Sequence, residues 1–405
     1  MKVQHFLSGA MLASGALGAR PFLNEPDTGI EDAITDLPVG ELPSLESMIS
    51  LPDYEWAARN YMPVDKYAYY RNGAAGEWSY RNNIEIFQQF RFRPRAMVDV
   101  TGIESTLPTT ILGHNVSAPF YISACGRGGF AHPDAEFNFI KAAANGSIMY
   151  MVRLTPPYPR PQRRLTSEMQ PSHVSTKSLE QIAAAKKEGQ VLFQQLYLDD
   201  KDDASTQEFF DRTKKAGYDA IVFTVDSPAN GNRPRANRFD VGSADADYNG
   251  YTWDYYHKLT NMTDLPIVLK GVGSVETARE AVEHGVPAII LSNHGGRQVD
   301  TSQSSLETAL EIHREAPEIF EQIEVWADGG VRYGVDVLKF LALGVRAVGL
   351  GRPVMYANVF GHEGVQQLIK QLKYEIAIDA ANIGVADLKK ITPDYVNWKS
   401  SPGFS

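Results

Sequence analysis

Cysteine is nearly absent from this chain, because Cys125 is the only one among 405 residues. A single cysteine excludes an intrachain disulfide framework and any metal site built from several cysteines. The sequence also lacks a stretch long and apolar enough to span a bilayer, and it has no block rich in lysine and arginine. With a net charge of −10, we do not expect nucleic acid among its ligands. No metal site is expected either.

What the chain does contain is enough apolar sequence, 43% hydrophobic residues, for a sizeable core. This length suits two or three ordinary domains or one large α/β barrel with an extension. Residues 1–19 combine Lys2 with the apolar run Phe6–Ala19, which resembles a secretory signal peptide. We therefore expect a secreted protein, and the alternative is a flexible N-terminal arm on a cytoplasmic one. Residues 20–44 read as a linker, residues 45–395 as the folded domain and residues 396–405 as a tail.

An alternation of strands and helices fills the middle of the chain. Apolar runs of strand length recur eight times, at Pro119–Ala124, Ile148–Arg153, Val191–Tyr197, Ala220–Asp226, Ile267–Gly271, Ala288–Asn293, Glu324–Gly330 and Ala347–Arg352. Helical stretches separate most of them, at Ala135–Asn145, Ser178–Glu188, Thr206–Ala216, Val275–His284, Ser305–Glu315 and Tyr333–Leu343. The pattern predicts the α/β class and a TIM (β/α)8 barrel.

Two further segments precede this barrel. The pattern from Leu45 to about Phe87 is helical, with breaks at Pro52, Pro63 and Gly73, and it predicts an N-terminal helical extension. Met97–Thr101 and Thr109–Leu112 are expected to form a small hairpin. The rival fold is an open doubly wound sheet, whose first strand should lead into a dinucleotide fingerprint. The glycine-rich run that follows Ala124 lacks that spacing, which favours the barrel.

Polar residues end most of the expected strands. In a barrel these ends share one face, which carries the active site. The residues at or just beyond the strand ends are Gln195, Tyr197, Thr224, Asp226, Lys270, His294, Arg297, Asp328, Gly351 and Arg352. So many polar groups on one face need a ligand to satisfy them, although a purely structural rim is the alternative.

The stretch Ala288–Asp300, AIILSNHGGRQVD, is the most informative of these strand ends. His294 can accept a proton near neutral pH, and the planar fork of Arg297 can grip a carboxylate. A histidine capping a surface loop is the alternative interpretation. Asp226, on the same face, would stabilise the imidazolium that forms when His294 takes a proton.

The loops after the last two strands predict a phosphate site. Asp328–Arg332 (DGGVR) and Gly349–Pro353 (GLGRP) combine glycines, whose backbone N–H groups can approach a ligand, with arginines. Lys270 places a cation near the barrel axis, where it could stabilise negative charge on a reduced ring system. An ion pair with a core carboxylate is the other interpretation of Lys270.

Together, the motifs SNHGGRQ, LKG, DGGVR and GRP make the chain resemble the FMN-dependent α-hydroxy acid oxidase and dehydrogenase family, which includes glycolate oxidase and lactate oxidase. The resemblance runs from about Met62 to Tyr395. It implies bound FMN and oxidation of an L-2-hydroxy acid to the 2-keto acid, by transfer of a hydride or of a carbanion's electron pair to the flavin. Electrons would pass on to oxygen or to another acceptor, and family analogy implies a homotetramer. The alternatives are a related flavoenzyme acting on a larger specialised metabolite and a flavin-binding barrel without turnover.

The resemblance also implies roles for individual residues. His294 matches the base, Asp226 its carboxylate partner, and Tyr197 the tyrosine beside the reacting hydroxyl. The substrate carboxylate would be bound by Arg297, Tyr69 and Arg233. The positions that match the flavin site are Ala124, Cys125, Gly126, Gln195, Thr224, Lys270 and Ser292 around the ring, and Asp328, Gly330, Arg332, Gly351 and Arg352 around the ribityl chain and phosphate.

The chain departs from the family pattern in three places. Ala124–Cys125–Gly126 replaces a proline-containing stretch, and Gly126 removes a methyl group from the wall near the flavin. Val152 and Arg153 replace a pair of serines, which adds a cation on the substrate side. The loop from Arg233 to Pro266 is shorter than the usual lid, so we expect a more open pocket.

Overall fold

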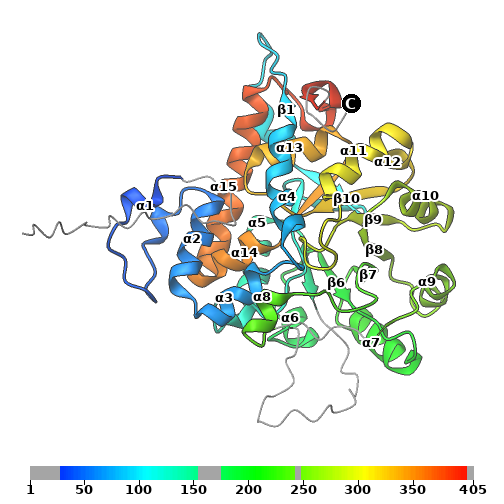
Figure 1. Ribbon diagram of the computed structural model, residues 1–405. Coiled ribbons are helices and arrows are strands. Elements are labelled where there is room, and N and C mark those ends of the chain that lie inside the picture. Colours follow the sequence, from blue (N-terminus) through cyan, green and yellow to red (C-terminus); the bar gives the residue numbers. More distant parts are fainter. Residues whose placement is uncertain (1–27, 154–174, 242–247, 399–405) are drawn as a thin grey trace, which may run out of the picture.

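The fold is a closed barrel, as the alternation predicts (Figure 1). The protein is described here by a computed structural model of residues 28–153, 175–241 and 248–398. Within those residues eight parallel strands close in the order β10-β11-β4-β5-β6-β7-β8-β9. The expected signal peptide, residues 20–27 of the expected linker and residues 399–405 of the expected tail lie outside the described residues. The barrel strands are β4 (Phe120–Ile122), β5 (Tyr150–Arg153), β6 (Leu192–Leu196), β7 (Ala220–Thr224), β8 (Ile267–Val272), β9 (Ala288–Leu291), β10 (Glu324–Asp328) and β11 (Ala347–Leu350).

The barrel strands are apolar on both faces because each face packs against a different core. One core fills the barrel, where Phe193 and Trp326 stack with ring centroids 5.9 Å apart. The other lies between the strands and the surrounding helices. The barrel interior is therefore packed rather than open, and a ligand site can form only at an end of the barrel.

The outer layer consists of helices that begin where the sequence provides caps. Ser178 and Ser304 each cap a helix, through hydrogen bonds with the residue three positions later. The helices that follow barrel strands, at or near the predicted positions, are α5 (Glu136–Gly146), α6 (Leu179–Ala184), α7 (Asp203–Lys215), α10 (Val275–Glu283), α11 (Ser305–Glu315) and α13 (Gly334–Ala342). The remainder are α8 (Pro234–Arg238), α9 (Trp253–Thr260), α12 (Ile319–Gln322), α14 (Arg352–Ala357) and α15 (Gly361–Asn382).

The N-terminal extension is helical, with α2 (Leu51–Tyr61), α3 (Val64–Arg71) and α4 (Trp78–Glu85). Pro52 does not break the pattern as expected, because it lies in the first turn of α2, where a missing N–H costs nothing. Helices α2 and α3 pack against α14, so the extension lies beside the segment that follows β11 (Figure 1). The extension thereby reaches the end of the barrel from which the β11 loop emerges.

The expected hairpin is only half correct. Thr109–Ile111 forms a strand, β2, but it pairs with β3 (His114–Val116) across a tight turn at Leu112 and Gly113. Both turn residues have positive φ, which suits a two-residue hairpin turn. Met97–Thr101 is not a strand, and the Met97 side chain is fully exposed. Strand β3 pairs with β2 in place of Met97–Thr101, because a two-residue turn connects β2 to β3 and a longer segment separates β2 from Thr101.

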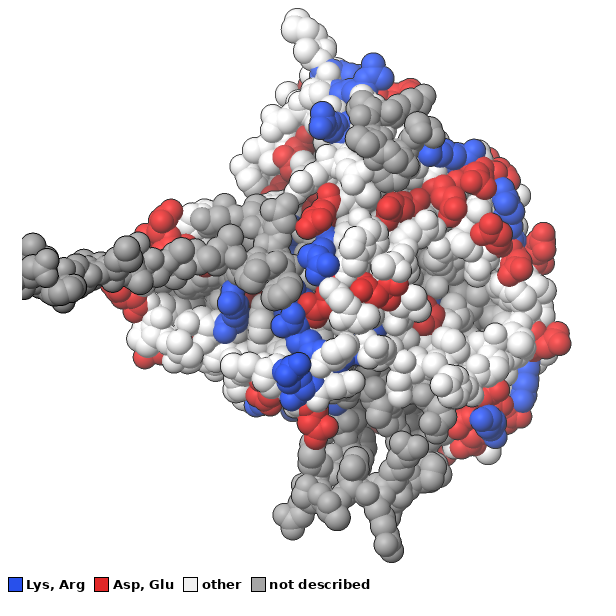
Figure 2. All heavy atoms as spheres, in the orientation of Figure 1, with Lys and Arg blue, Asp and Glu red and all other residues white. Residues whose placement is uncertain are grey.

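Short elements also form near both predicted domain boundaries. Within the expected linker, α1 (Ile30–Ala33) is a single helical turn. Within the expected tail, β12 (Val396–Asn397) pairs with β1 (Arg91–Phe92). No helix among the described residues is both long and apolar enough to cross a membrane. Over the face shown in Figure 2, lysine and arginine gather over α3, α4 and α8, while acidic side chains are frequent over α11 and α12.

Candidate active site

A cavity that opens to solvent lies at the carboxyl ends of the barrel strands. The predicted residues that line it are Ala124, Cys125, Gln195, Tyr197, Lys270, His294, Arg297, Asp328, Gly330, Arg332, Gly351 and Arg352. Arg153, one of the departures from the family pattern, lines it as well.

The other predicted residues are not part of the cavity wall, but most of them contact it. Asp226, Ser292 and Thr224 each hydrogen-bond a lining side chain. Arg233 donates to the backbone oxygen of Arg297. The predicted site residues that do not line the cavity are Tyr69, Asp226, Arg233, Thr224, Ser292 and Gly126. Gly126 directly follows the lining residue Cys125.

His294 occupies a strained backbone position at the end of β9. Its φ is +61°, a left-handed conformation that costs a residue with a side chain some energy. The local sequence supports this turn, because His294 N donates to Ser292 Oγ (3.0 Å) and Gly296 N donates to Asn293 Oδ1 (2.9 Å). The turn directs the imidazole into the cavity, which is why a short SNHGG run can deliver a reactive side chain there.

The imidazole of His294 bridges Asp226 and Tyr197. Its Nδ1 lies 2.9 Å from Asp226 Oδ1, and its Nε2 lies 3.0 Å from the Tyr197 hydroxyl. Burial raises the pKa of Asp226, but His294 and Lys270 outweigh it, so that the pKa falls below its usual value and the group is ionised. An ionised carboxylate only accepts, so the proton between them is on Nδ1 and Nε2 is left with a lone pair.

The electrostatic setting keeps His294 neutral. Burial lowers its pKa to about 4, and the attraction of Asp226 only partly opposes that effect. At neutral pH the imidazole therefore has no charge and can accept a proton at Nε2. Asp226 would then stabilise the imidazolium, which is the arrangement that a general base requires.

A group of cations surrounds the ring of Tyr69 beside this base. The guanidinium carbon of Arg297 lies 5.4 Å from the ring centroid, and that of Arg127 lies 4.4 Å from it. Arg233 Nε donates to Arg297 O at 2.6 Å, and its Nη2 donates to Gln298. Nε of Arg297 is buried and has no hydrogen-bond partner among the described residues. A carboxylate bound here would satisfy it.

Lys270 is paired with a core carboxylate, as one interpretation expects, and it also lines the cavity, where its role toward a reduced ring stays a prediction. Its Nζ donates to Ser292 Oγ (2.9 Å) and lies 3.1 Å from Asp328 Oδ2, and Ser292 Oγ donates to Asp328 Oδ1 (2.6 Å). Burial lowers the pKa of Lys270, but Asp328 and Asp226 outweigh it and raise the pKa above its usual value. The ammonium therefore stays protonated at the barrel axis.

In the expected phosphate loop after β10, the backbone packs closely against the backbone of the N-terminal extension. Gly330 has φ +82°, and a Cβ there would lie 1.7 Å from the backbone oxygen of Asn83. Any larger residue would push the loop away from the extension. Arg332 is buried, lines the cavity and lies 3.8 Å from Glu55 of α2. Its guanidinium is therefore held where it can meet an anion.

The guanidinium of Arg352 has contacts that the sequence did not predict. Its three nitrogens donate to the backbone oxygens of Tyr70 (2.9 Å), Gly295 (3.0 Å) and Asn72 (2.8 Å). This side chain ties the extension to the His294 loop. The same side chain lines the cavity, so its role at the phosphate end stays a prediction.

The cavity fits FMN on its own features. It offers a buried Gln195 Oε1 and a buried Arg297 Nε, neither of which has a hydrogen-bond partner in the part of the chain that the structure describes. It also offers glycine backbone next to a buried arginine at the phosphate end, and a protonated lysine at the centre. A flat polar ring with a charged phosphate tail is the kind of ligand that these groups satisfy.

Comparison with known proteins agrees with this geometry. A family model described as FMN-dependent dehydrogenase matches residues 58–155, 162–248 and 241–398. The peroxisomal (S)-2-hydroxyacid oxidase of Arabidopsis thaliana is 32% identical over 383 residues, covering 88% of this chain and 98% of that protein. The chain belongs to the FMN-dependent dehydrogenase family. The family, the TIM barrel, the FMN cofactor and the class of FMN-dependent oxidoreductase that the sequence predicts are confirmed.

Other relatives extend the comparison. The L-lactate dehydrogenase (cytochrome) of Wickerhamomyces anomalus is 31% identical over 383 residues, covering 88% of this chain but only 63% of that protein. Among solved structures, a flavocytochrome b2 variant superposes with a TM-score of 0.79 at 33% identity, covering 88% of this chain and 89% of that one. Mandelate oxidase with (S)-2-phenylpropionate superposes with a TM-score of 0.74 at 32% identity, covering 86% and 98%.

Some lining residues escaped the sequence analysis. Ser123 and Gly295 belong to the cavity wall but were not among the predicted site residues. Each lies next to a predicted residue or within a predicted loop, so a reading of whole strand ends, rather than of charged groups alone, would have found them. Gly349 allows the strands to approach, because a Cβ there would lie 2.1 Å from Ser123 Oγ.

Proposed function

We propose that this protein oxidises an L-2-hydroxy acid to the 2-keto acid with FMN as the electron acceptor. The observation that carries the proposal is a neutral His294 held between Asp226 and Tyr197, in one cavity with the unpartnered Nε of Arg297. A base and an anion clamp at this spacing suit a substrate with a hydroxyl next to a carboxylate.

The chain's own residues would share the work as follows. Gln195, Lys270 and Arg332 would hold FMN, which supplies a two-electron acceptor when bound. Arg297, with Arg233 and Tyr69 around it, would bind the substrate carboxylate. His294 Nε2 would take the proton that the substrate releases, in a hydride or a carbanion route alike, and the Tyr197 hydroxyl would donate to the substrate oxygen.

Oxygen as the final acceptor and a homotetrameric assembly are further parts of the proposal, supported by the family resemblance alone. A second candidate is a related activity on a larger substrate. It is favoured by Arg153, which adds a cation to the wall of the cavity, and by Gly126, which lacks a side chain next to the lining residue Cys125.

Anaerobic mixing of the flavin-loaded protein with a panel of L-2-hydroxy acids tests these alternatives. We expect at least one small acid to bleach the flavin absorbance, and admission of air to restore it with formation of hydrogen peroxide. Bleaching that air does not reverse would exclude oxygen as the acceptor. If none of the small acids bleaches the flavin while a bulkier hydroxy acid does, the second candidate replaces the first.

A further inference from the structure

One segment of the extension, residues Tyr69–Ser79, joins three loops of the active face; we call it the rim segment. It reaches the β9 loop through Ala74 N to Gly296 O (2.8 Å) and the β7 loop through Ala75 N to Asn232 O (2.8 Å). Arg352 adds the β11 loop through its bonds to backbone oxygens of the segment. The rim segment is therefore the common support of loops that come from distant parts of the chain.

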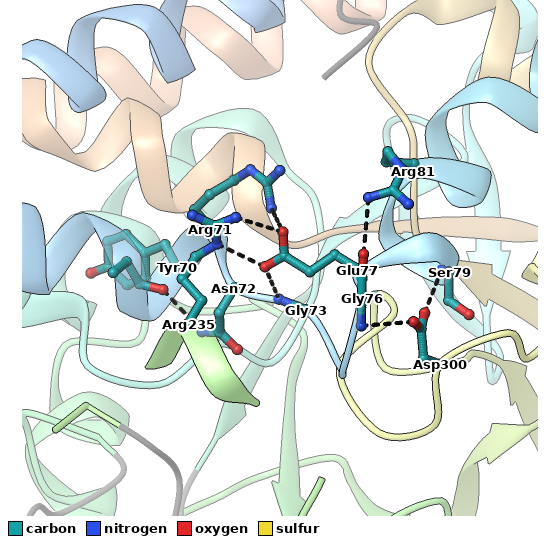
Figure 3. Close-up of polar contacts among 12 residues, drawn as sticks. Tyr70, Arg71, Asn72, Gly73, Gly76, Glu77, Ser79, Arg81, Arg235 and Asp300 are labelled. Carbon is teal, nitrogen blue, oxygen red and sulfur yellow. Dashed lines mark hydrogen bonds and ion pairs between the residues drawn. The ribbon is translucent and has the colours of Figure 1, made fainter. Parts of the chain in front are cut away.

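Glu77 is the charged centre of the rim segment (Figure 3). Its side chain is buried, and its carboxylate has four contacts. Oε1 accepts from Gly73 N (3.0 Å) and Arg235 Nε (2.8 Å), and Oε2 accepts from Arg235 Nη2 (2.8 Å) and Arg71 Nη1 (3.3 Å). The Arg235 pair is bidentate, which fixes direction as well as distance.

The carboxylate is ionised in this setting. Burial raises the pKa of Glu77, but the hydrogen bond from Arg235 and the charges of Arg71 and Arg235 outweigh it and lower the pKa. Its backbone has φ +60°, and the same residue begins α4 as its N-cap. Since a strained residue persists only where its surroundings over-determine it, these contacts have to hold the turn.

The two arginines connect Glu77 to the substrate-binding residues. Arg71 follows Tyr69 by two positions at the end of α3, and Arg235 follows Arg233 by two positions at the start of α8. Tyr69 and Arg233 in turn both contact Arg297, one through its ring and one through the backbone oxygen. One buried carboxylate thus fixes the two short helical ends that carry the neighbours of Arg297.

We propose that Glu77 is a positioning residue that aligns Tyr69, Arg233 and Arg297 on the substrate carboxylate, through its paired contacts with Arg71 and Arg235. The inference rests on the proposed function, since it assigns Glu77 to the carboxylate subsite of that reaction. Glu77 touches neither the cavity wall nor the base, so its effect should fall on binding rather than on the proton transfer.

The test compares Glu77→Gln with the parent protein, both loaded with FMN. Gln keeps the shape but loses the charge and the bidentate pair. We expect the dissociation constant of propionate, a carboxylate without the reacting hydroxyl, to rise roughly 10-fold or more, since small displacements of binding groups have effects of this size. The flavin absorbance reports that binding without turnover. KM should rise in parallel, with kcat within about threefold, because a uniform binding contact changes KM alone.

Arg235→Gln is the second variant, because the Arg235 side chain is about one-third exposed (36%) and its loss is less of a risk to folding. It should weaken propionate binding in the same direction, and the double variant should lose little more than Glu77→Gln alone, as expected of two residues that act through one contact. Glu104→Gln, at an exposed carboxylate, is the matched control and should change nothing.

The outcomes separate the two claims. A parent protein whose flavin no hydroxy acid reduces would overturn the proposed function. A parent that turns over while Glu77→Gln leaves the propionate constant and KM unchanged would overturn the inference alone. Equal loss of kcat and flavin content without a change in propionate affinity would also overturn it, because that pattern marks a purely structural residue.

Discussion

The two sides of the cavity differ in how fully their contacts are made. On the side of β7, β8 and β9, hydrogen bonds of 2.9–3.0 Å join His294 to Asp226 and to Ser292, and Lys270 to Ser292. On the side of β4 and β5, the chain instead departs from the family pattern, with Arg153 in the wall and Gly126 next to the lining residue Cys125. The proposed base and its carboxylate partner therefore belong to one side of the cavity, and the other side is where this chain departs from the family pattern.

Substitution of His294, the proposed base, tests the side of the cavity formed by β7, β8 and β9. We predict that His294→Gln keeps bound flavin but lowers kcat by roughly 100-fold or more, because the amide cannot take the proton. Flavin content and anaerobic reduction rates are the measurements. His294→Ala, which also removes the contact with Tyr197, is the companion variant. Turnover at the parent rate in both variants would exclude His294 as the base.

The pH dependence of kcat/KM tests the protonation state of His294. Because burial lowers the pKa of His294 to about 4, the neutral, proton-accepting form persists at all pH values above that point. We predict that kcat/KM of the flavin-loaded enzyme is flat on the acid side down to about pH 5. It should then fall about tenfold per pH unit below pH 4, after correction for titration of the substrate's own carboxyl group.

Asp226→Asn provides the control for this profile. It removes the attraction that raises the pKa of His294, so any remaining activity should persist to a still lower pH. Recovery of activity on return to pH 7 separates titration from acid unfolding. In the parent protein, an acid-side fall of kcat/KM centred near pH 6.5 would contradict the buried, neutral imidazole.

The sequence predicted the barrel because apolar runs of strand length alternate with helices, a pattern that no local detail disturbs. It predicted most residues of the cavity because they lie at the end of a strand or in the loop that follows it. It could not predict the contact of Glu77 with Arg235, since the two lie 158 positions apart and no periodicity links them. The error at Met97–Thr101 has a similar origin, because the choice of pairing partner depended on the turn at Leu112 and Gly113.

Arg153 offers the test of the side of the cavity formed by β4 and β5. Its buried guanidinium carbon lies 4.8 Å from the ring centroid of Tyr197. Burial raises the pKa of Cys125, and the positive charges of Arg297, Arg153 and Arg352 partly oppose that rise. A guanidinium in this cavity favours an anionic or strongly polar group on the substrate. We predict that Arg153→Ser lowers kcat/KM for a 2-hydroxy acid with a second carboxylate, such as malate, by about 10-fold, the equivalent of one modest charge-assisted contact.

The same variant should change kcat/KM for lactate by less than about threefold, because lactate has no second group for Arg153 to bind. Arg153→Lys is the conservative control and should keep part of the preference for malate, since a point charge lacks the planar fork. An equal fall for both acids would mean that Arg153 acts on Tyr197 or on the flavin rather than on the substrate. The ratio of the two kcat/KM values therefore decides between two roles for Arg153. Either it sets substrate specificity from the side of β4 and β5, or it supports the reaction through Tyr197 or the flavin.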